Sequence, residues 1–267
     1  MAPGWGRLAT EEACVTLRVF LAGKVAVVGT DGRVVDEASL PGLQGRVVLA
    51  MLAAERERSV SRDELADELW AEERPPAWEI GLKALVSKLR TALADVGVDG
   101  QTIAGAFGLY QLKLPPRTWI DLEAAADGLH RAETLVGKER WDDAAGWALA
   151  ARAITSRPFV EGANGPWVER RRAWLRDLYL RSLEVLADVW IRRGDHILAV
   201  SDTEEALRSE PFRESLYRLL MRAHASAGNR AEALKVYERC RRLLADELGV
   251  DPSPEIEAIY LDILRSM

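Results

Sequence analysis

The sequence has 267 residues, enough for one or two hydrophobic cores, and its 48% hydrophobic and 29% charged residues are typical of a soluble globular protein. A net charge of −6 gives the chain no overall basic character of the kind that marks many nucleic-acid-binding proteins. Two cysteines are too few for a disulfide framework, and the sequence has neither an apolar run of about 18 residues nor a signal-peptide pattern, so we expect a cytoplasmic protein with no membrane partner.

The first predicted elements are short strands in residues 15–40. Apolar and other residues alternate there, and the Asp-Gly dipeptide at 31–32 lies between two valine-rich runs, which predicts a hairpin. From Leu43 the spacing of apolar residues becomes helical. A second helix is expected after Ser61, because Ser61 and Glu64 have the S-x-x-E spacing of a capping box.

The next predicted helix, residues 78–93, has an unusual distribution of charge. Its apolar residues share one face, at the spacing of a buried stripe: Leu82, Val86, Leu89 and Leu93. Polar residues and cations, with no acidic residue between Glu79 and Asp95, occupy the rest: Lys83, Ser87, Lys88, Arg90 and Thr91. A surface helix usually mixes both signs of charge, so this cationic helix indicates a negatively charged partner.

Two short strands around the turn at 105–108 follow, in the stretch "TIAGAFGLYQLKL". The proline pair at 115–116 is typical of a linker, and from Ile120 onward helical spacing dominates. We therefore expect a boundary near residues 115–119, between an α+β domain at 13–117 and an all-helical domain at 118–267.

The order of the elements in the first domain is that of a winged helix-turn-helix. Strands come first, then two helices, the cationic helix and a hairpin that forms the wing. Such a domain lays its last helix in the major groove of double-stranded DNA, with the hairpin along the backbone beside it.

Candidate DNA-binding residues follow from this fold. We expect cations to meet phosphates or guanine edges from the cationic helix, namely Lys83, Lys88 and Arg90, with Ser87 and Thr91 on the same arc. Arg58 and Arg62 can hold a flanking phosphate near the start of the capped helix, and Lys113 is the first cation of the wing. Ile80 and Ala84 lie where base-reading side chains are expected and can contact thymine methyl groups.

The second domain contains a repeat with a shift of 34 residues. It pairs Gly194 with Gly228, and Ala199 with Ala233. A helix-turn-helix period of this length is that of the tetratricopeptide repeat, with a weaker earlier copy at 138–153. The alternative is a generic helical bundle. In either case Leu186, Trp190, Leu198, Leu207, Leu216 and Leu220 are expected in its core.

The sequence contains no motif of catalytic or metal-binding chemistry. The histidines do not occur in H-E-x-x-H or beside cysteine, the Gly-Lys at 137–138 fails the phosphate-loop pattern at both ends, and no G-x-S-x-G is present. We therefore expect no enzyme activity, no metal site and no cofactor.

Two stretches resemble a known family. "SRDELADELW" with "LKALVSKLRTAL" looks like the DNA-binding domain of the Streptomyces antibiotic regulatory protein (SARP) family, whose members are OmpR-type winged-helix activators. "LADELGVDPSPE" is similar to the end of that family's bacterial transcriptional activation domain. The resemblance covers about residues 15–265 and implies a sequence-specific transcriptional activator of the short type, without a nucleotide-binding module.

The resemblance also implies partners. Activators of this kind recruit RNA polymerase at promoters with tandem repeats, where two copies of the chain pair as a homodimer on DNA. The loop before the recognition helix is where OmpR-like activators contact polymerase, which indicates Glu72 and Glu73 as polymerase contacts.

A second interpretation stays open. Residues 1–117 hold 14 Lys and Arg against 16 Asp and Glu, and the wing carries no cation before Lys113, where family members often have arginine. The chain would then be a helical-repeat adaptor whose winged helix has lost DNA binding and docks a protein. Because the proline pair at 115–116 is expected to separate two cores, residues 1–118 are predicted to fold alone and to retain weak DNA binding.

Overall fold

The computed structural model describes residues 17–70, 73–98 and 102–265. These residues form two compact units. The first holds the described residues up to Ala125 together with Ile154–Arg176, and the second holds Ala126–Ala153 and the residues from Asp177 onward.

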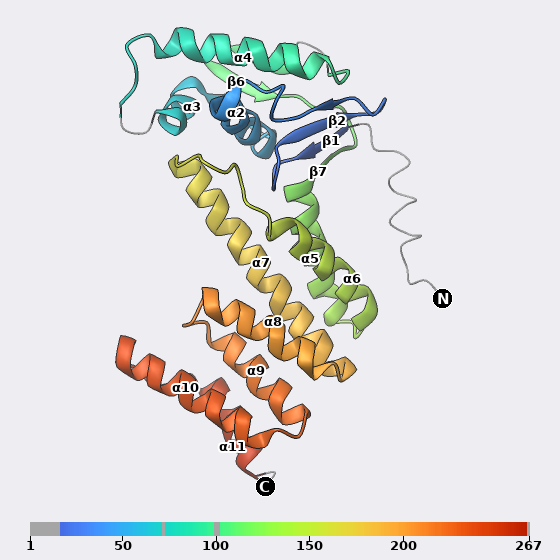
Figure 1. Ribbon diagram of the computed structural model, residues 1–267, viewed down its shortest axis with the longest axis vertical. Helices are drawn as coiled ribbons and strands as arrows, with labels where there is room; N and C mark the ends of the chain where they lie inside the picture. Colours follow the sequence, from blue (N-terminus) through green and yellow to red (C-terminus); the bar gives the residue numbers. More distant parts are fainter. Residues whose placement is uncertain (1–16, 71–72, 99–101, 266–267) are drawn as a thin grey trace. The chain divides into compact units, whose positions relative to one another are not determined.

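A four-stranded sheet begins the first unit, with the strand order β3-β2-β1-β7 (Figure 1). Its strands are β1 (Leu17–Phe20), β2 (Ala26–Gly29), β3 (Val34–Val35) and β7 (Thr118–Ile120). β2 and β3 are antiparallel around the Asp-Gly turn, where Gly32 has a φ of 80°, so the predicted hairpin is confirmed. The proline pair lies in the connection between β6 and β7, and β7, a strand that the sequence did not indicate, pairs in parallel with β1. A strand of three residues is too short to show alternation.

Three helices and a second sheet complete the first half of this unit. The helices α2 (Gly42–Ala54), α3 (Arg62–Leu69) and α4 (Trp78–Ala94) contact one another. The second sheet has the order β4-β6-β5, from strands β4 (Val60–Ser61), β5 (Ile103–Ala106) and β6 (Leu109–Leu112). The predicted capping box is formed: the Ser61 hydroxyl accepts from the Glu64 N–H at 3.1 Å, and the Ser61 N–H donates to the Glu64 carboxylate at 2.8 Å.

One hydrophobic core joins the sheet and these helices to a segment much later in the chain. Phe159, Val160 and Val168 are buried in the same cluster as the strands and α2, and they lie within residues 154–176. The backbone at Ala22 forms an isolated bridge with Phe159. The domain boundary at 117/118 stays a prediction. The first compact unit, however, also includes residues 154–176 from beyond that boundary.

The first turn of the long helix α7 (Pro166–Arg193) is held by two glutamates. Glu68, which is 6% exposed, accepts hydrogen bonds from the Trp167 and Val168 N–H groups at 2.7 and 3.1 Å. Glu55 accepts from the Trp167 indole at 3.1 Å and from Arg171 at 2.8 Å. Because a helix N-terminus leaves its first N–H groups unsatisfied, the Glu68 carboxylate serves as its cap.

A buried aspartate fixes the passage from β7 into α5 (Asp121–Val136). The Asp121 carboxylate accepts from the Leu21 and Ala22 N–H groups, both at 2.9 Å, and from the Leu122 N–H at 2.8 Å. Burial raises the pKa of Asp121 above its ordinary value, against the opposite effect of these three donors. The carboxylate thus joins the end of β1 to the start of α5.

The second unit is helical and contains the predicted repeat. It is built from parts of α5 and α7, from most of α6 (Trp141–Thr155), and from α8 (His196–Ser209), α9 (Glu214–Ser226), α10 (Arg230–Leu248) and α11 (Pro254–Arg265). The turns before α8 and α10 are nearly superimposable in their dihedral angles: φ is 80° at Gly194 and 79° at Gly228, and Asp195 and Asn229 both have a ψ of 57°. Positive φ explains why both turns contain glycine.

The weaker third copy has the same junction with a different residue. Between α5 and α6, Glu139 takes the left-handed conformation, with a φ of 57°, and the Arg140 N–H donates to the Leu135 carbonyl at 3.0 Å. The bond from Asn229 to the carbonyl of His224 has the same five-residue span. A glutamate in place of glycine explains why this copy is hard to detect in the sequence.

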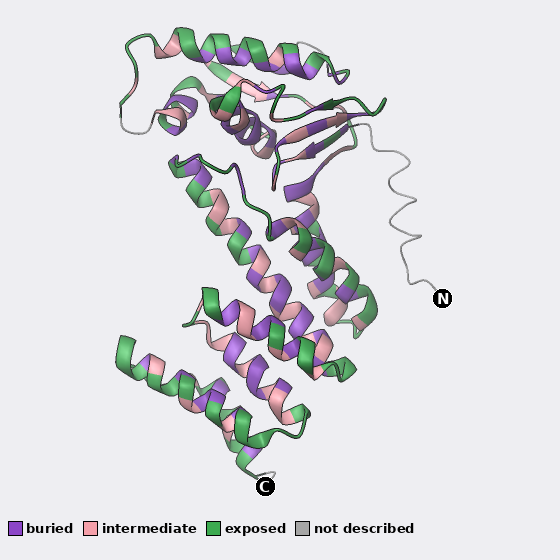
Figure 2. Ribbon diagram, viewed as in Figure 1, coloured by how far each residue is buried: buried purple, intermediate pink, exposed green. Residues whose placement is uncertain are grey.

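Small residues and leucines fill the core of the second unit, and the buried positions on its helices are purple in Figure 2. The paired alanines Ala199 and Ala233 are fully buried, as are Leu186, Leu216 and Leu220. Leu198 is 47% exposed on α8, so its predicted place in the core is wrong. The residue before Ala199 faces outward, because adjacent residues differ by about 100° around a helix.

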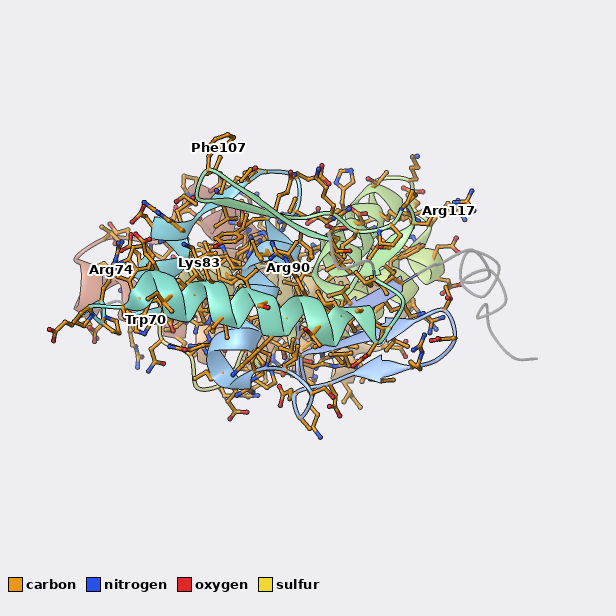
Figure 3. All side chains as sticks on the ribbon, turned by 90° about the horizontal axis from the view of Figure 1, so that it is seen from above. Trp70, Arg74, Lys83, Arg90, Phe107 and Arg117 are labelled. Atoms are coloured by element: carbon orange, nitrogen blue, oxygen red, sulfur yellow. The ribbon has the colours of Figure 1, made fainter. Side chains whose placement is uncertain are left out.

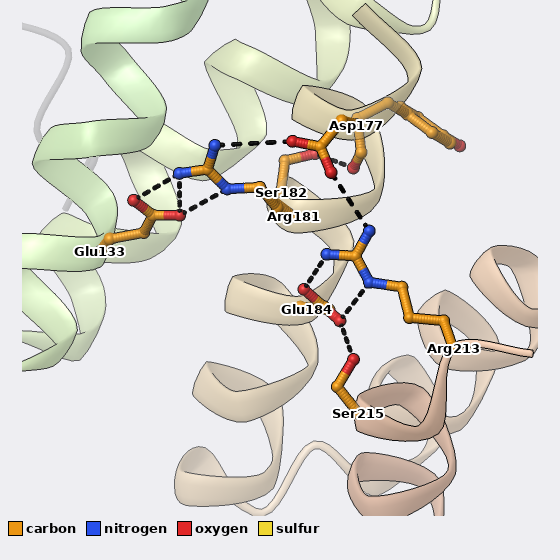
Figure 4. A network of polar contacts seen from close by, with 8 residues as sticks. Glu133, Asp177, Arg181, Ser182, Glu184, Arg213 and Ser215 are labelled. Atoms are coloured by element: carbon orange, nitrogen blue, oxygen red, sulfur yellow. Dashed lines mark hydrogen bonds and ion pairs between the residues drawn. The ribbon is translucent and has the colours of Figure 1, made fainter. Parts of the chain in front are cut away.

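Ion pairs join α5, α7 and the start of α9 within this unit (Figure 4). Arg181 on α7 bonds Glu133 on α5 at 2.7 Å and lies 3.6 Å from Asp177. Arg213 bonds Glu184 at 2.9 Å and lies 3.3 Å from Asp177. Arg181, one of the arginines in the sequence at 167–182, is therefore engaged by ion pairs within the second unit.

Candidate nucleic-acid interface

Helix α4 separates a buried face from a polar one, as its sequence predicts. The stripe formed by Leu82, Val86, Leu89 and Leu93 is buried in the core of the first unit. The opposite face is open, and Ile80 is 70% exposed on it. The other exposed residues of that face are Lys83, Ala84, Ser87, Lys88 and Thr91. Figure 3 looks onto this helix and shows the β5–β6 hairpin beside it.

Two of the three cations on α4 are free to meet a partner. Lys83 and Lys88 are exposed, and within the described part of the chain neither forms an ion pair. Arg90 differs, because its guanidinium donates two hydrogen bonds to the Ile103 carbonyl, at 3.1 and 2.7 Å. The expectation of three equivalent cations is therefore corrected: Arg90 fastens strand β5 to α4.

The arginines around the start of α3 are also partly engaged. Arg58 bonds Glu55 at 3.0 Å and Glu64 at 2.9 Å, and its side chain stays 46% exposed. The bond from the Ser61 N–H is the main cause that lowers the pKa of Glu64, which keeps this partner of Arg58 ionised. Arg62 lies 3.4 Å from Glu79 at the start of α4. Both guanidinium groups thus carry local acidic partners at the edge of the surface.

The hairpin supplies little charge to this face. Lys113, just past the end of β6, is exposed, and its N–H donates to the Thr102 carbonyl at 2.6 Å. At the other end, the two-residue turn between Ala106 and Leu109 holds Phe107, which is fully exposed, and Gly108. Sequence analysis missed Phe107, because the sequence alone does not show which two residues of the hairpin form the turn.

The acidic turn before α4 is only partly described. Glu72 lies outside the described residues, and Glu73 is exposed. The next residue, Arg74, bonds Asp63 at 2.8 Å and Asp67 at 2.5 Å and lies over the Trp78 ring at 5.0 Å. These two bonds raise the pKa of Arg74. Arg74 therefore ties the end of the turn to α3, a contact that the sequence did not indicate.

The described residues lack two other features, a cluster of metal-ligating side chains and a membrane-spanning helix. Their His, Cys, Asp and Glu side chains form no group of three that could hold a metal ion. None of the helices in the described ranges is both long and apolar enough to cross a membrane.

Comparison with known proteins finds a matching domain family and similar proteins that are regulators. The model of the bacterial transcriptional activator domain family matches residues 120–264, more than half of the chain. The regulatory protein AfsR of Streptomyces coelicolor is 33% identical over 265 residues, which are 97% of this chain and 25% of AfsR. The transcriptional regulatory protein EmbR of Mycobacterium tuberculosis is 30% identical over 227 residues, which are 82% of this chain and 57% of EmbR.

A solved structure agrees with these relatives. Mycobacterium tuberculosis EmbR in complex with a low-affinity phosphopeptide has a TM-score of 0.84 and 28% identity, and the match covers 94% of this chain and 66% of that one. The chain spans from a quarter to about two thirds of the length of these relatives. Together, the domain match and the regulator relatives show that the chain belongs to the SARP family of transcriptional regulators and carries its bacterial transcriptional activator domain.

Proposed function

We propose that the first unit contains an OmpR-type winged helix-turn-helix that binds double-stranded DNA, with α4 as recognition helix and the β5–β6 hairpin as wing. The observation that carries this proposal is the exposed face of α4, where Lys83 and Lys88 stand without acidic partners among the described residues. Two exposed ammonium groups next to the Ser87 hydroxyl suit phosphates and base edges, whereas the Thr91 hydroxyl donates to the Ser87 carbonyl at 3.2 Å. Lys113 flanks this face and can add a phosphate contact, and Arg62 can do so only by exchanging Glu79 for the phosphate.

The test replaces the two lysines. We expect Lys83→Ala with Lys88→Ala to lower affinity for duplex DNA at least about tenfold, since each charge-assisted bond contributes roughly 1 kcal/mol or more. The slope of log affinity against log salt should flatten by about two units. Fluorescence anisotropy across a salt series, on a site selected from random duplex DNA, measures both quantities. Arg90 is left in place because its loss would release β5.

A matched control removes the same charge elsewhere. Lys138→Ala with Lys235→Ala, on exposed positions of the second unit, should leave affinity and slope nearly unchanged. Equal effects of the two double variants would show that only net charge matters and would refute the interface on α4.

The adaptor remains the second candidate function, favoured by the exposed apolar side chains Ile80 and Phe107 on this face. An adaptor should show little binding to any duplex even at low salt, whereas a DNA-binding regulator should lose affinity steeply as salt rises. The same anisotropy series therefore separates the two.

We further propose that the protein activates transcription by recruiting RNA polymerase, as a homodimer on tandem half-sites, with helical repeats of the tetratricopeptide type providing the contacts between copies. Glu72 and Glu73 are the candidate polymerase contacts. Phosphate would repel them, and Glu73 is exposed at the turn before α4.

Charge reversal tests the polymerase contact. Glu72→Lys with Glu73→Lys should leave promoter binding within about twofold, because both residues precede the DNA-facing part of α4, while transcription in vitro should fall severalfold. Footprinting and run-off transcription on the same template give the two measurements. A parallel loss of binding and transcription, or no change in either, would remove this assignment.

A further inference from the structure

The tip of the β5–β6 hairpin combines two features that do not favour folding. Phe107 is fully exposed, and its φ of 53° lies in the left-handed region, where Gly108 follows with 78°. Ala106 pairs with Leu109, so Phe107 and Gly108 form the whole turn. Both have positive φ, as in a type I′ turn. Asparagine followed by glycine is the preferred sequence for such a turn.

Phenylalanine is a costly choice at this position. A left-handed conformation costs a side chain with a Cβ about 1–2 kcal/mol, and the exposed ring recovers none of this by packing. Single exposed apolar residues are ordinary on protein surfaces. An exposed aromatic ring held in a disfavoured backbone conformation is not, and it indicates that the ring acts on something outside the chain.

The hairpin that carries the Phe107 ring is held in place by contacts with α3 and α4. Four residue pairs connect β5 with β6, and Arg90 fixes β5 to α4 through the Ile103 carbonyl. The turn itself rests on α3, because the Arg62 N–H donates to the Gly108 carbonyl at 2.8 Å and the Arg62 stem lies against Gly108. Figure 3 shows Phe107 at the end of this arm, beyond the face that carries Lys83.

The residues of the β5–β6 hairpin exclude a purely ionic role for it in DNA binding. No charged residue occurs between Ile103 and Leu112, so the strands of the hairpin can form no ionic contacts with phosphates. Arg62 beneath the turn is 45% exposed, but it lies 3.4 Å from Glu79, so it adds little uncompensated charge at the tip. The hairpin instead holds the planar apolar ring of Phe107 at a fixed distance from the cationic helix α4.

We propose that Phe107 is an apolar wedge that enters the minor groove next to the segment contacted by α4 and partly unstacks a base step there. This inference rests on the proposed DNA binding and adds a residue that determines specificity. Inserted apolar side chains pry base steps open and bend the duplex, at the lowest cost at flexible pyrimidine–purine steps. Phe107 therefore selects such a step through its deformability rather than through hydrogen bonds.

Phe107→Asn tests the wedge without threatening the fold, because it creates the preferred turn sequence. We expect the melting temperature of the full chain to stay equal or rise, while affinity for the selected site falls roughly tenfold, within the range for an aromatic ring stacked on a base. The salt slope should not change, since no charge is removed. This separates the variant from Lys83→Ala with Lys88→Ala, which flattens the slope.

A second measurement reports the base step directly. 2-Aminopurine placed in turn at each adenine of the selected site should brighten at one step on binding of the unchanged chain and stay dark with Phe107→Asn. Val34→Thr is the matched control, because Val34 is an exposed apolar residue of β3 in the same unit, and it should behave as the unchanged chain does.

The outcomes distinguish this inference from the proposed function. If the unchanged chain binds DNA and Phe107→Asn binds equally well, or if no 2-aminopurine brightens, the wedge is refuted and DNA binding stands. Lost transcription with intact DNA binding would assign the ring to a protein partner and refute the wedge as well. Failure of the unchanged chain to bind any duplex would overturn both.

Discussion

Residues 1–118 produced alone should fail to form a stable domain, contrary to the expectation from the sequence. The segment 154–176 places Phe159, Val160 and Val168 in the core that surrounds the first sheet. Full burial of such side chains contributes about 1.5–3 kcal/mol each, so the loss of this segment, which also carries Trp167 and Leu175, amounts to on the order of 10 kcal/mol. Whole domains have only about 5–15 kcal/mol of stability.

A second fragment provides the control. Residues 1–125 joined by a flexible linker to 154–176 contain the complete first unit and should unfold cooperatively in urea, whereas residues 1–118 should show no cooperative transition. Near-ultraviolet circular dichroism, which reports fixed aromatic packing, should separate the two fragments in the same way. A sharp transition for residues 1–118 at the midpoint of the linked fragment would show that the boundary at 117/118 is a true domain boundary.

Glu68→Ala should lower the free energy of unfolding of the full chain by about 2–3 kcal/mol. The carboxylate is buried and accepts from two N–H groups at the start of α7, and its removal leaves both donors without a partner. Its close approach also depends on Gly165, where any side chain would collide with the carboxylate. Urea unfolding measures the loss.

Glu57→Ala is a suitable comparison for this variant. Glu57 lies nearby in sequence, but its side chain is 88% exposed and 3.7 Å from Arg56, so its removal should change stability by no more than about 0.5 kcal/mol. If Glu68→Ala is as mild as this control, water replaces the carboxylate and the glutamate is not the cap of α7.

Much of the fold is predictable from local patterns. The stripe on α4, the capping box at Ser61 and the paired glycines of the repeat depend on residues close together in sequence, and each is found as expected. β7 and the place of 154–176 depend on pairing across about a hundred residues, for which a single sequence carries no periodic signal.

The candidate site is predictable to the same extent. The outward face of α4 follows from helical spacing, so Lys83 and Lys88 were found. Spacing also placed Arg90 there, but a long side chain can turn back to a carbonyl thirteen residues away, and nothing in the sequence identifies that acceptor. The exposure of Phe107 required knowing which two residues form the turn.

The parallel pairing of β1 with β7 has a consequence for folding during synthesis on the ribosome. β1 emerges first, but its partner strand and the Asp121 carboxylate that binds its end follow about a hundred residues later. Closing so long a loop is slow, and until then one edge of the sheet stays open to other chains. A nascent or prematurely terminated chain therefore lacks β7 and cannot complete the four-stranded sheet. Folded regulator can form only after synthesis has passed β7 and reached the helices that follow it.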